Sequence, residues 1–498
     1  AAPGPQRLHG CSNRIVVKSI LGPYPAPRAE GCVRSVPHYL AGYGLLPHNY
    51  SGGAFRPCGK CVNFAGSRPS ACPPWTRRQN GTIPGGRDHN EVQADMLSPQ
   101  AALTSGSIIS PFTQLRRLLH GIKAGDPKPI ELTIGEPREA MPEFISAKLA
   151  EAMPLWGKYP PIRGSDDLRG AISRWLSRRY SLTSAVDPGK EIVVLNGSRE
   201  GLFFACVPAV GRKDVRGQPA ILMCNPYYSA YVSGALAVGA EPVYLNATRA
   251  TGFLPDLDAI AADKALLART AALFICSPAN PQGAVADKGY IAKALGLARQ
   301  HDFMLFLDEC YSEIFTEAAP PGGLEVAGAT ADRFKNLVVF NSLSKRSNLP
   351  GLRSAFAAGD AAFLESYSEV RNMCAPTVPG PIQHASAAAW DDEVHVEAAR
   401  AAYRRKFAIA DEVLKGRFRY TRPAGGFCLW LDMSQNGGDR EATVTLWKRK
   451  GVKVIPGSFL AQTGRDGTNP GANYVRVALV QDPATIREAL ERTIAVLR

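Results

Sequence analysis

Seven apolar segments of strand length, separated by stretches long enough for helices, constrain the fold of this chain more than any other feature. The segments are residues 192–195, 220–224, 242–245, 272–276, 303–307, 337–340 and 354–358. Most of them are apolar throughout, which is typical of strands buried on both faces of a mainly parallel sheet. The stretches between most of them, such as residues 284–299, have room for crossover helices. The pattern therefore predicts an α/β fold.

The first 95 residues have a different composition. They hold 11 Lys and Arg against 4 Asp and Glu, 25 Pro and Gly, and five of the 11 cysteines. Pro and Gly at this density break helices and strands alike, so we expect residues 1–95 to be irregular or disordered. Met96 is the first methionine and ordered patterning starts just after it, which favours an interpretation of this segment as a non-native extension.

Other interpretations of residues 1–95 fit less well. The apolar run at residues 15–17 is too short for a secretory signal, and a transit peptide fits only loosely. Cys58 and Cys61 have the spacing of half a zinc site, but no second pair follows, so we predict no metal. The segment lacks helix-turn-helix and other nucleic-acid-binding motifs, and we expect no nucleic-acid partner despite the net charge of +14.

Polar residues follow the apolar segments where strands are expected to end. Gly197 and Ser198 follow the first segment, and a tyrosine pair at 227–228 follows the second. Later segments are followed by Asn280, by Asp308 and by a Ser-Leu-Ser-Lys sequence at 342–345. Ligands of open α/β sheets bind beyond the carboxyl ends of the strands. We therefore expect these residues to form one site.

Four of these motifs together resemble a known family. Asn280-Pro281-X-Gly283, Asp308-X-X-Tyr311 and Ser342-X-Ser344-Lys345, with Arg353 eight residues further on, are similar to the class I/II aminotransferases. The resemblance covers residues 105–498 and implies fold type I, the fold of pyridoxal 5'-phosphate (PLP) enzymes. In this fold a large domain with a mainly parallel seven-stranded sheet flanked by helices is joined to a smaller α+β domain.

The resemblance also suggests how the chain is divided. Residues 96–145 would form an N-terminal arm and part of the small domain, 146–385 the large PLP-binding domain, and 386–498 the C-terminal small domain.

The family assigns roles around the ring of the cofactor. Lys345 would hold the PLP aldehyde as a Schiff base and then move a proton between substrate and cofactor. Asp308 would keep the pyridinium nitrogen protonated, and Tyr228 would stack on the ring. Asn280 and Tyr311 would donate to its phenolic oxygen.

The family also supplies phosphate and substrate partners. Tyr159 matches the tyrosine that reaches the phosphate of a neighbouring subunit, which implies a homodimer with shared active sites. Arg476 would pair with the substrate α-carboxylate through its planar fork, and Gly135 would approach the same carboxylate. The expected phosphate donors within the chain are Ser198, Arg199, Ser342, Ser344 and Arg353.

The segment after Lys345 suggests which amino donor the enzyme uses. Its Arg-Ser-Asn-X-Pro-Gly-X-Arg-Ser sequence, residues 346–354, is most similar to N-succinyldiaminopimelate aminotransferases. This implies amino transfer from N-succinyl-LL-2,6-diaminopimelate to 2-oxoglutarate in lysine and diaminopimelate biosynthesis. A class I/II aminotransferase of other specificity and a PLP carbon–sulfur β-lyase remain as alternatives.

The cellular setting follows from absences in the sequence. The chain has no secretory signal and no apolar run long enough to span a membrane. We therefore expect a cytoplasmic enzyme with no membrane partner.

Overall fold

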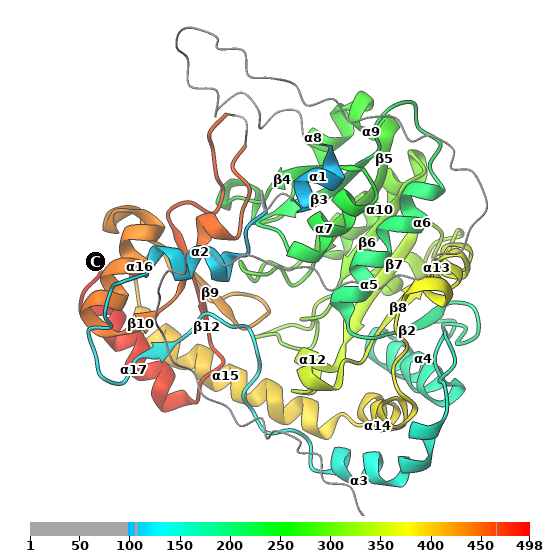
Figure 1. The fold of residues 1–498 in the computed structure, drawn as a ribbon, viewed down its shortest axis with the longest axis horizontal. Coiled ribbons are helices and arrows are strands. Elements are labelled where there is room, and N and C mark those ends of the chain that lie inside the picture. Colours follow the sequence, from blue (N-terminus) through cyan, green and yellow to red (C-terminus); the bar gives the residue numbers. More distant parts are fainter. Residues whose placement is uncertain (1–97, 105–107, 465) are drawn as a thin grey trace, which may run out of the picture. The chain divides into compact units, whose positions relative to one another are not determined.

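The computed structural model describes residues 98–104, 108–464 and 466–498. Its largest sheet has seven strands in the order β2-β8-β7-β6-β5-β3-β4 (Figure 1). Within this sheet, β8 alone runs in the direction opposite to the other six strands. The strands are β2 (Ile192–Leu195), β3 (Ala220–Asn225), β4 (Glu241–Asn246), β5 (Thr270–Cys276), β6 (Met304–Asp308), β7 (Leu337–Ser342) and β8 (Ala355–Gly359). All seven predicted segments are confirmed as strands, within two residues of the expected bounds.

Alternate side chains of these strands enter two separate cores. On β5, Leu273 and Ile275 join one core, whereas Phe274 joins the other. The first core includes α4 (Asp166–Tyr180), α10 (Lys288–Gln300), α11 (Gly323–Gly328) and α14 (Gly380–Asp391). The second includes α5 (Ser198–Phe204), α6 (Cys206–Gly211), α7 (Ser229–Ala237) and α13 (Ala361–Cys374). Helices on both faces explain why the strands are apolar throughout.

Helix boundaries follow the capping residues more closely than the apolar pattern. The helix expected over residues 284–299 begins at Lys288, because the Asp287 side chain accepts a hydrogen bond from the Tyr290 backbone N–H at 2.7 Å. Asp360 caps α13 in the same way through the N–H of Phe363, at 3.0 Å. These caps satisfy N–H groups that have no partner within the helix.

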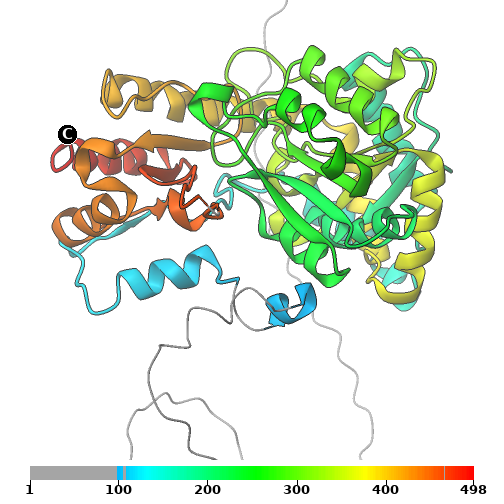
Figure 2. The ribbon, with the colours of Figure 1, turned by 90° about the horizontal axis from the view of Figure 1, so that it is seen from above.

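A second group of elements forms the smaller α+β domain that the fold implies. β9 (Cys428–Asp432), β11 (Ile455–Pro456) and β12 (Tyr474–Ala478) form an antiparallel sheet, and β1 (Ile130–Glu131) pairs in parallel with β10 (Val452–Lys453). Their apolar side chains share a core with α15 (Val394–Leu414), α16 (Gly438–Lys450) and α17 (Pro483–Ile494). Figure 2 shows these C-terminal elements, in orange and red, grouped beside the green strands of the large sheet. The exact domain boundaries remain a prediction.

Short helices complete the described chain. They are α1 (Pro99–Thr104), α2 (Pro111–Leu118), α3 (Phe144–Glu151), η2 (Met153–Gly157), η3 (Arg249–Thr251), α8 (Leu257–Ala262), α9 (Lys264–Arg269), α12 (Leu343–Arg346), η4 (Pro350–Leu352), η5 (Ser434–Asn436) and η6 (Gly457–Phe459). No helix in the described part is long and apolar enough to cross a membrane. The expectations for residues 1–95, including Cys58 and Cys61, concern residues outside the described ranges.

Candidate active site

The carboxyl ends of the parallel strands bring several predicted residues to one edge of the large sheet. Asp308 is the last residue of β6, and Ser342 is the last residue of β7. Lys345 follows on α12, directly after β7, while Asn280 lies in the loop after β5. Because β5, β6 and β7 are neighbours and run in the same direction, these residues emerge side by side.

The Lys345 side chain lies against the segment that precedes α3. Its ammonium donates a hydrogen bond to the carbonyl oxygen of Gly135, and its Nζ lies 5.3 Å from the centre of the Phe427 ring. Burial lowers the pKa of Lys345 to about 8, because an ammonium loses hydration in this environment. A lysine in this range carries a useful fraction of neutral, nucleophilic amine near neutral pH.

Asp308 is a buried carboxylate that accepts hydrogen bonds from Tyr231 and from both the backbone N–H and the thiol of Cys310. Its Oδ2 accepts from the Tyr231 hydroxyl at 2.7 Å, and its Oδ1 accepts from the Cys310 backbone N–H at 3.2 Å. Burial raises the pKa of Asp308, whereas the hydrogen bond from Tyr231 lowers it. These donors therefore offset part of the cost of keeping this buried carboxylate ionised.

Arg476 on β12 reaches the large sheet from the smaller domain. Its Nη2 donates to the Thr133 carbonyl at 2.6 Å, and its Nη1 approaches the Asn280 side-chain oxygen at 3.4 Å. The Nε of this buried guanidinium has no hydrogen-bond partner among the described residues. A planar fork with a spare donor suits a carboxylate, which accepts two parallel hydrogen bonds.

Phe427 contacts several residues of this site, although no motif in the sequence distinguishes it. Its ring meets the Tyr311 ring edge-on at 5.3 Å and stacks on Tyr403 at 5.6 Å. A Cβ on Gly135 would come within 3.1 Å of the same ring. Glycine at position 135 therefore allows the backbone to pass close to Phe427 and to Lys345.

A tight turn brings together the residues predicted to hold the phosphate. Gly197 has φ of 85°, and a Cβ at this position would lie 1.8 Å from Nη2 of Arg353. Only glycine lets the turn and the Arg353 guanidinium approach so closely. Ser198 then begins α5, and Arg199 donates from Nε to the Tyr228 hydroxyl at 2.6 Å.

Cys310 connects two predicted phosphate donors to this turn. The side chains of Ser198 and Ser342 both interact with its buried thiol, so the two serines lie next to one sulfur atom. Ser344 is half-buried on α12, one residue before Lys345. Tyr159 does not join the set within this chain, since its side chain is fully exposed at 102%.

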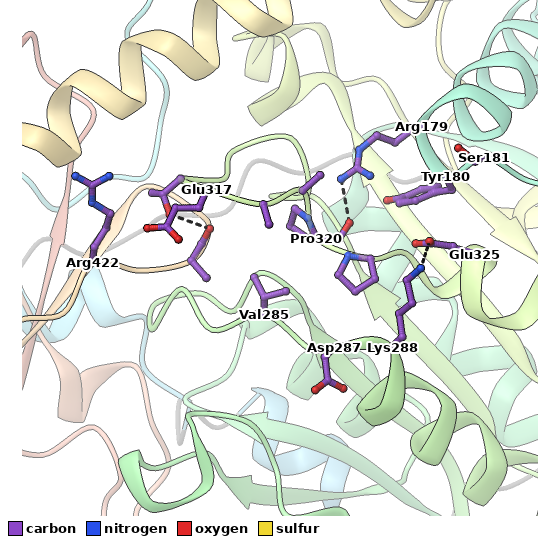
Figure 3. A pocket seen from close by; sticks show the side chains of 15 residues that line it. Arg179, Tyr180, Ser181, Val285, Asp287, Lys288, Glu317, Pro320, Glu325 and Arg422 are labelled. Carbon is purple, nitrogen blue, oxygen red and sulfur yellow. Dashed lines mark hydrogen bonds and ion pairs between the residues drawn. The ribbon is translucent and has the colours of Figure 1, made fainter.

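A cleft of about 620 Å³ lies apart from these residues (Figure 3). Its basic side chains are already paired: Lys288 with Glu325, Arg179 with Glu313, and Arg422 with Asp411. None of the predicted site residues lines it. The lining residues are Arg179, Tyr180, Ser181, Val285, Asp287, Lys288, Thr316, Glu317, Ala318, Ala319, Pro320, Pro321, Glu325, Arg422 and Ala424. We therefore assign no catalytic role to this cleft.

Comparison with known proteins identifies the family. The model of aminotransferase class I and II matches residues 127–492. The chain belongs to this family. The LL-diaminopimelate aminotransferases of Desulforudis audaxviator and Syntrophobacter fumaroxidans are 32% and 30% identical to it; the alignments cover 76% of this chain and 93% and 94% of theirs.

Solved structures of aminotransferases match as well. An aminotransferase from Neisseria meningitidis aligns with a TM-score of 0.75 and 37% identity, covering 80% of this chain and all of that chain. The aminotransferase AspB of Helicobacter pylori aligns with a TM-score of 0.70 and 32% identity, over 78% of this chain and 97% of that chain. The resemblance stated from the motifs is confirmed, and with it the fold and the dependence on PLP.

The residues at the sheet edge fit PLP. The turn at Gly197 leaves no space for a side chain, and serine hydroxyls and Arg353 lie beside it, as a phosphate dianion requires. Asp308 offers a buried carboxylate for a ring nitrogen, and Lys345 offers an amine with a lowered pKa. The unpartnered Nε of Arg476 remains available to a substrate carboxylate.

Sequence reasoning missed three buried residues around this site. Tyr231 bonds Asp308, and its only sequence signal was its position three residues after Tyr228 on the same helical turn. Arg346, next to Lys345, donates to the Ala389 carbonyl at 2.6 Å and to the Glu393 carboxylate at 2.8 Å. Phe427 comes from the smaller domain, far along the chain, where no motif marks it.

We expect Lys345 to be the lysine that reacts with the PLP aldehyde. Borohydride reduction of the loaded enzyme followed by peptide mapping should find the cofactor on Lys345. Lys345→Ala should abolish turnover and keep the melting temperature, whereas the exposed Lys448→Ala should change neither. A label on any other lysine would contradict this assignment.

The lowered pKa of Lys345 gives the same assignment a pH dependence. Only the neutral amine attacks an aldehyde, so the rate of PLP uptake by the apoprotein should rise with pH and level off above about pH 8. Below that value, the rate should fall about tenfold per pH unit as Nζ becomes protonated. Stopped-flow absorbance measures the rate, and a profile that still rises steeply above about pH 10 would indicate a lysine with an ordinary pKa.

Proposed function

We propose that this aminotransferase moves the amino group of a diaminopimelate-type donor to 2-oxoglutarate, with N-succinyl-LL-2,6-diaminopimelate as the donor. The observation that carries an amino-acid site is the convergence of two cations on one short segment. Nζ of Lys345 bonds the Gly135 carbonyl, and Nη2 of Arg476 bonds the Thr133 carbonyl. An α-amino acid carries its amino group and its carboxylate on the same carbon. Its site therefore needs a group that reacts with the amine and, close to it, a cationic partner for the carboxylate.

The motif after Lys345 favours the N-succinylated donor, while the names of the relatives favour LL-diaminopimelate as a second candidate. Both donors carry a second, distal carboxylate. Arg346 is an unsuitable partner for that carboxylate, since it is buried and already bonded to Ala389 and Glu393. Arg346, although part of the motif, therefore faces the protein interior next to Lys345. The distal carboxylate must be bound by other residues.

The proposed roles follow from the environment of each side chain. When bound, PLP supplies the electron sink that lets the substrate Cα lose its proton. Lys345, with its lowered pKa, would take that proton and deliver it to the C4' carbon of the cofactor. Arg476 would hold the α-carboxylate, and Asp308 would keep the ring nitrogen protonated. Asn280, next to Arg476, and Tyr311, against Phe427, would hold the phenolic oxygen.

A single-turnover screen of donors tests the proposed substrate. The loaded enzyme is mixed with each donor, and conversion to the pyridoxamine form is followed by absorbance. We expect N-succinyl-LL-diaminopimelate to react faster than aromatic, branched or acidic amino acids. A faster reaction with LL-diaminopimelate selects the second candidate. Pyruvate and ammonia formed from a cysteine derivative, with no pyridoxamine form, would instead indicate a β-lyase.

Arg476→Lys should weaken both half-reactions. Lysine keeps the charge but loses the fork, and loss of one bidentate charge-assisted pair costs roughly 2–5 kcal/mol. Both kcat/KM values, for the amino donor and for 2-oxoglutarate, should therefore fall together. Arg487→Lys is the control, because Arg487 pairs with Glu412 on the surface. A loss confined to one half-reaction would contradict a shared carboxylate site.

We further propose a cytoplasmic homodimer in which Tyr159 reaches the phosphate site of the partner. In support, the segment around η2 exposes Met153, Trp156 and Tyr159 to solvent, at 57%, 54% and 102%. Exposed apolar side chains gathered on one segment are typical of an interface.

The dimer makes Tyr159→Phe informative. The variant should keep the mass of a dimer in light scattering but bind PLP more weakly, by about tenfold or more for one lost hydrogen bond to a charged phosphate. A monomeric wild-type protein with full activity would refute the shared site.

A further inference from the structure

Tyr231 is a buried tyrosine for which the proposed reaction has no assigned use. It lies on the first turn of α7 and is 1% exposed. Its hydroxyl donates to Oδ2 of Asp308 at 2.7 Å, which joins α7 to the end of β6. A buried hydroxyl needs a partner, but an ordinary acceptor would suffice. Here the partner is the carboxylate expected to face the cofactor ring.

The Tyr231 ring is held from two sides. It stacks on Phe274 with centres 4.5 Å apart and planes 8° apart, and Tyr228 meets it edge-on at 5.6 Å. Phe274 belongs to β5, a neighbour of β6 in the sheet. The hydroxyl position is therefore fixed by packing on the sheet itself. Burial, reinforced by the Asp308 carboxylate, raises the pKa of Tyr231 well above its ordinary value, so the phenol stays a neutral donor.

Two of the donors on Asp308 constrain the carboxylate plane. Tyr231 occupies a position on Oδ2, and the Cys310 N–H occupies one on Oδ1. A carboxylate has about four acceptor positions, so one remains for a ring nitrogen beside these donors and the weaker Cys310 thiol. With one donor on each oxygen, the group cannot rotate about its Cβ–Cγ bond without losing a hydrogen bond.

Tyr228 and Tyr231 serve different partners despite their close spacing. The Tyr228 hydroxyl accepts from Arg199 at the start of α5, whereas the Tyr231 hydroxyl reaches Asp308. Through these two tyrosines, the start of α7 contacts both α5, which follows the turn at Gly197, and the buried Asp308 carboxylate.

We propose that Tyr231 is a positioning residue that orients the Asp308 carboxylate toward the ring nitrogen of PLP and favours its ionised form. This inference rests on the proposed role of Asp308. It predicts that the Tyr231 hydroxyl contributes to PLP binding only through Asp308.

The experiment is a double-mutant cycle on PLP affinity, measured by titrating the apoproteins of wild type, Tyr231→Phe, Asp308→Ala and the double variant. Tyr231→Phe should weaken PLP binding about tenfold, the size expected for one hydrogen bond to a charged group. In the Asp308→Ala background, the same change should alter the affinity less than about twofold. Tyr244→Phe is the matched control, because it removes the hydroxyl of another, half-buried tyrosine on β4, three strands away from β6 in the sheet.

The cycle separates this inference from the role on which it rests. If Asp308→Ala leaves PLP affinity unchanged, the role of Asp308 fails. If Asp308→Ala weakens binding but Tyr231→Phe does not, or if the Tyr231→Phe loss persists without Asp308, only the positioning role fails.

A pH titration covers the case in which Asp308→Ala does not fold. Without its phenol donor, Asp308 becomes more basic and draws the shared proton away from the ring, which makes the ring less positive. The pH at which the absorbance of bound PLP changes should then rise by about half a unit or more in Tyr231→Phe and stay constant in Tyr244→Phe. An unchanged titration in Tyr231→Phe would overturn the proposal.

Discussion

Burial of charged groups at the carboxyl edge of the sheet governs the chemistry of this enzyme. Asp308 and Lys345 lie close to a core that excludes water, and burial shifts both pKa values toward the neutral form. The chain offsets this for Asp308 with hydrogen bonds from Tyr231 and Cys310. It leaves Lys345 with a lowered pKa, which is the state that a nucleophilic amine requires. Burial thus suits both proposed roles: hydrogen-bond donors help to keep Asp308 ionised, whereas Lys345 has a lowered pKa that favours the neutral amine.

The sheet that creates this environment was largely predictable from the sequence. Its strands are apolar on both faces, and this composition indicates that helices cover both faces of the sheet. The motifs at the strand ends were predictable as well, because side chains at the ends of adjacent parallel strands meet. Asp308, Ser342 and Lys345 follow this rule. Helix boundaries such as the start of α10 were less accessible, since one capping side chain decides them.

The site residues that come from the smaller domain could not be predicted from local sequence patterns, because contacts between distant parts of the chain place them there. Arg476 was found only by similarity to a family, and its bonds to Thr133 and Asn280 join three distant parts of the chain. Phe427 and Tyr403 look like ordinary core aromatics in the sequence. Phe427, which directly precedes β9, lies against Lys345 and Gly135 and stacks on Tyr403 of α15, and no local sequence signal predicts this packing.

The carbonyls of Thr133 and Gly135 have a consequence for the energetics of recognition. Nζ of Lys345 and Nη2 of Arg476 already have backbone acceptors in the free protein, so a ligand exchanges acceptors at these two atoms and gains a new hydrogen bond at Nε of Arg476. The benefit then depends on the difference in acceptor strength. A carboxylate surpasses a neutral carbonyl because its bonds to a guanidinium are charge-assisted. At the proposed carboxylate site, an amide or ester would offer little more than the backbone carbonyl it displaces, so the resting contacts would favour ligands with a free carboxylate.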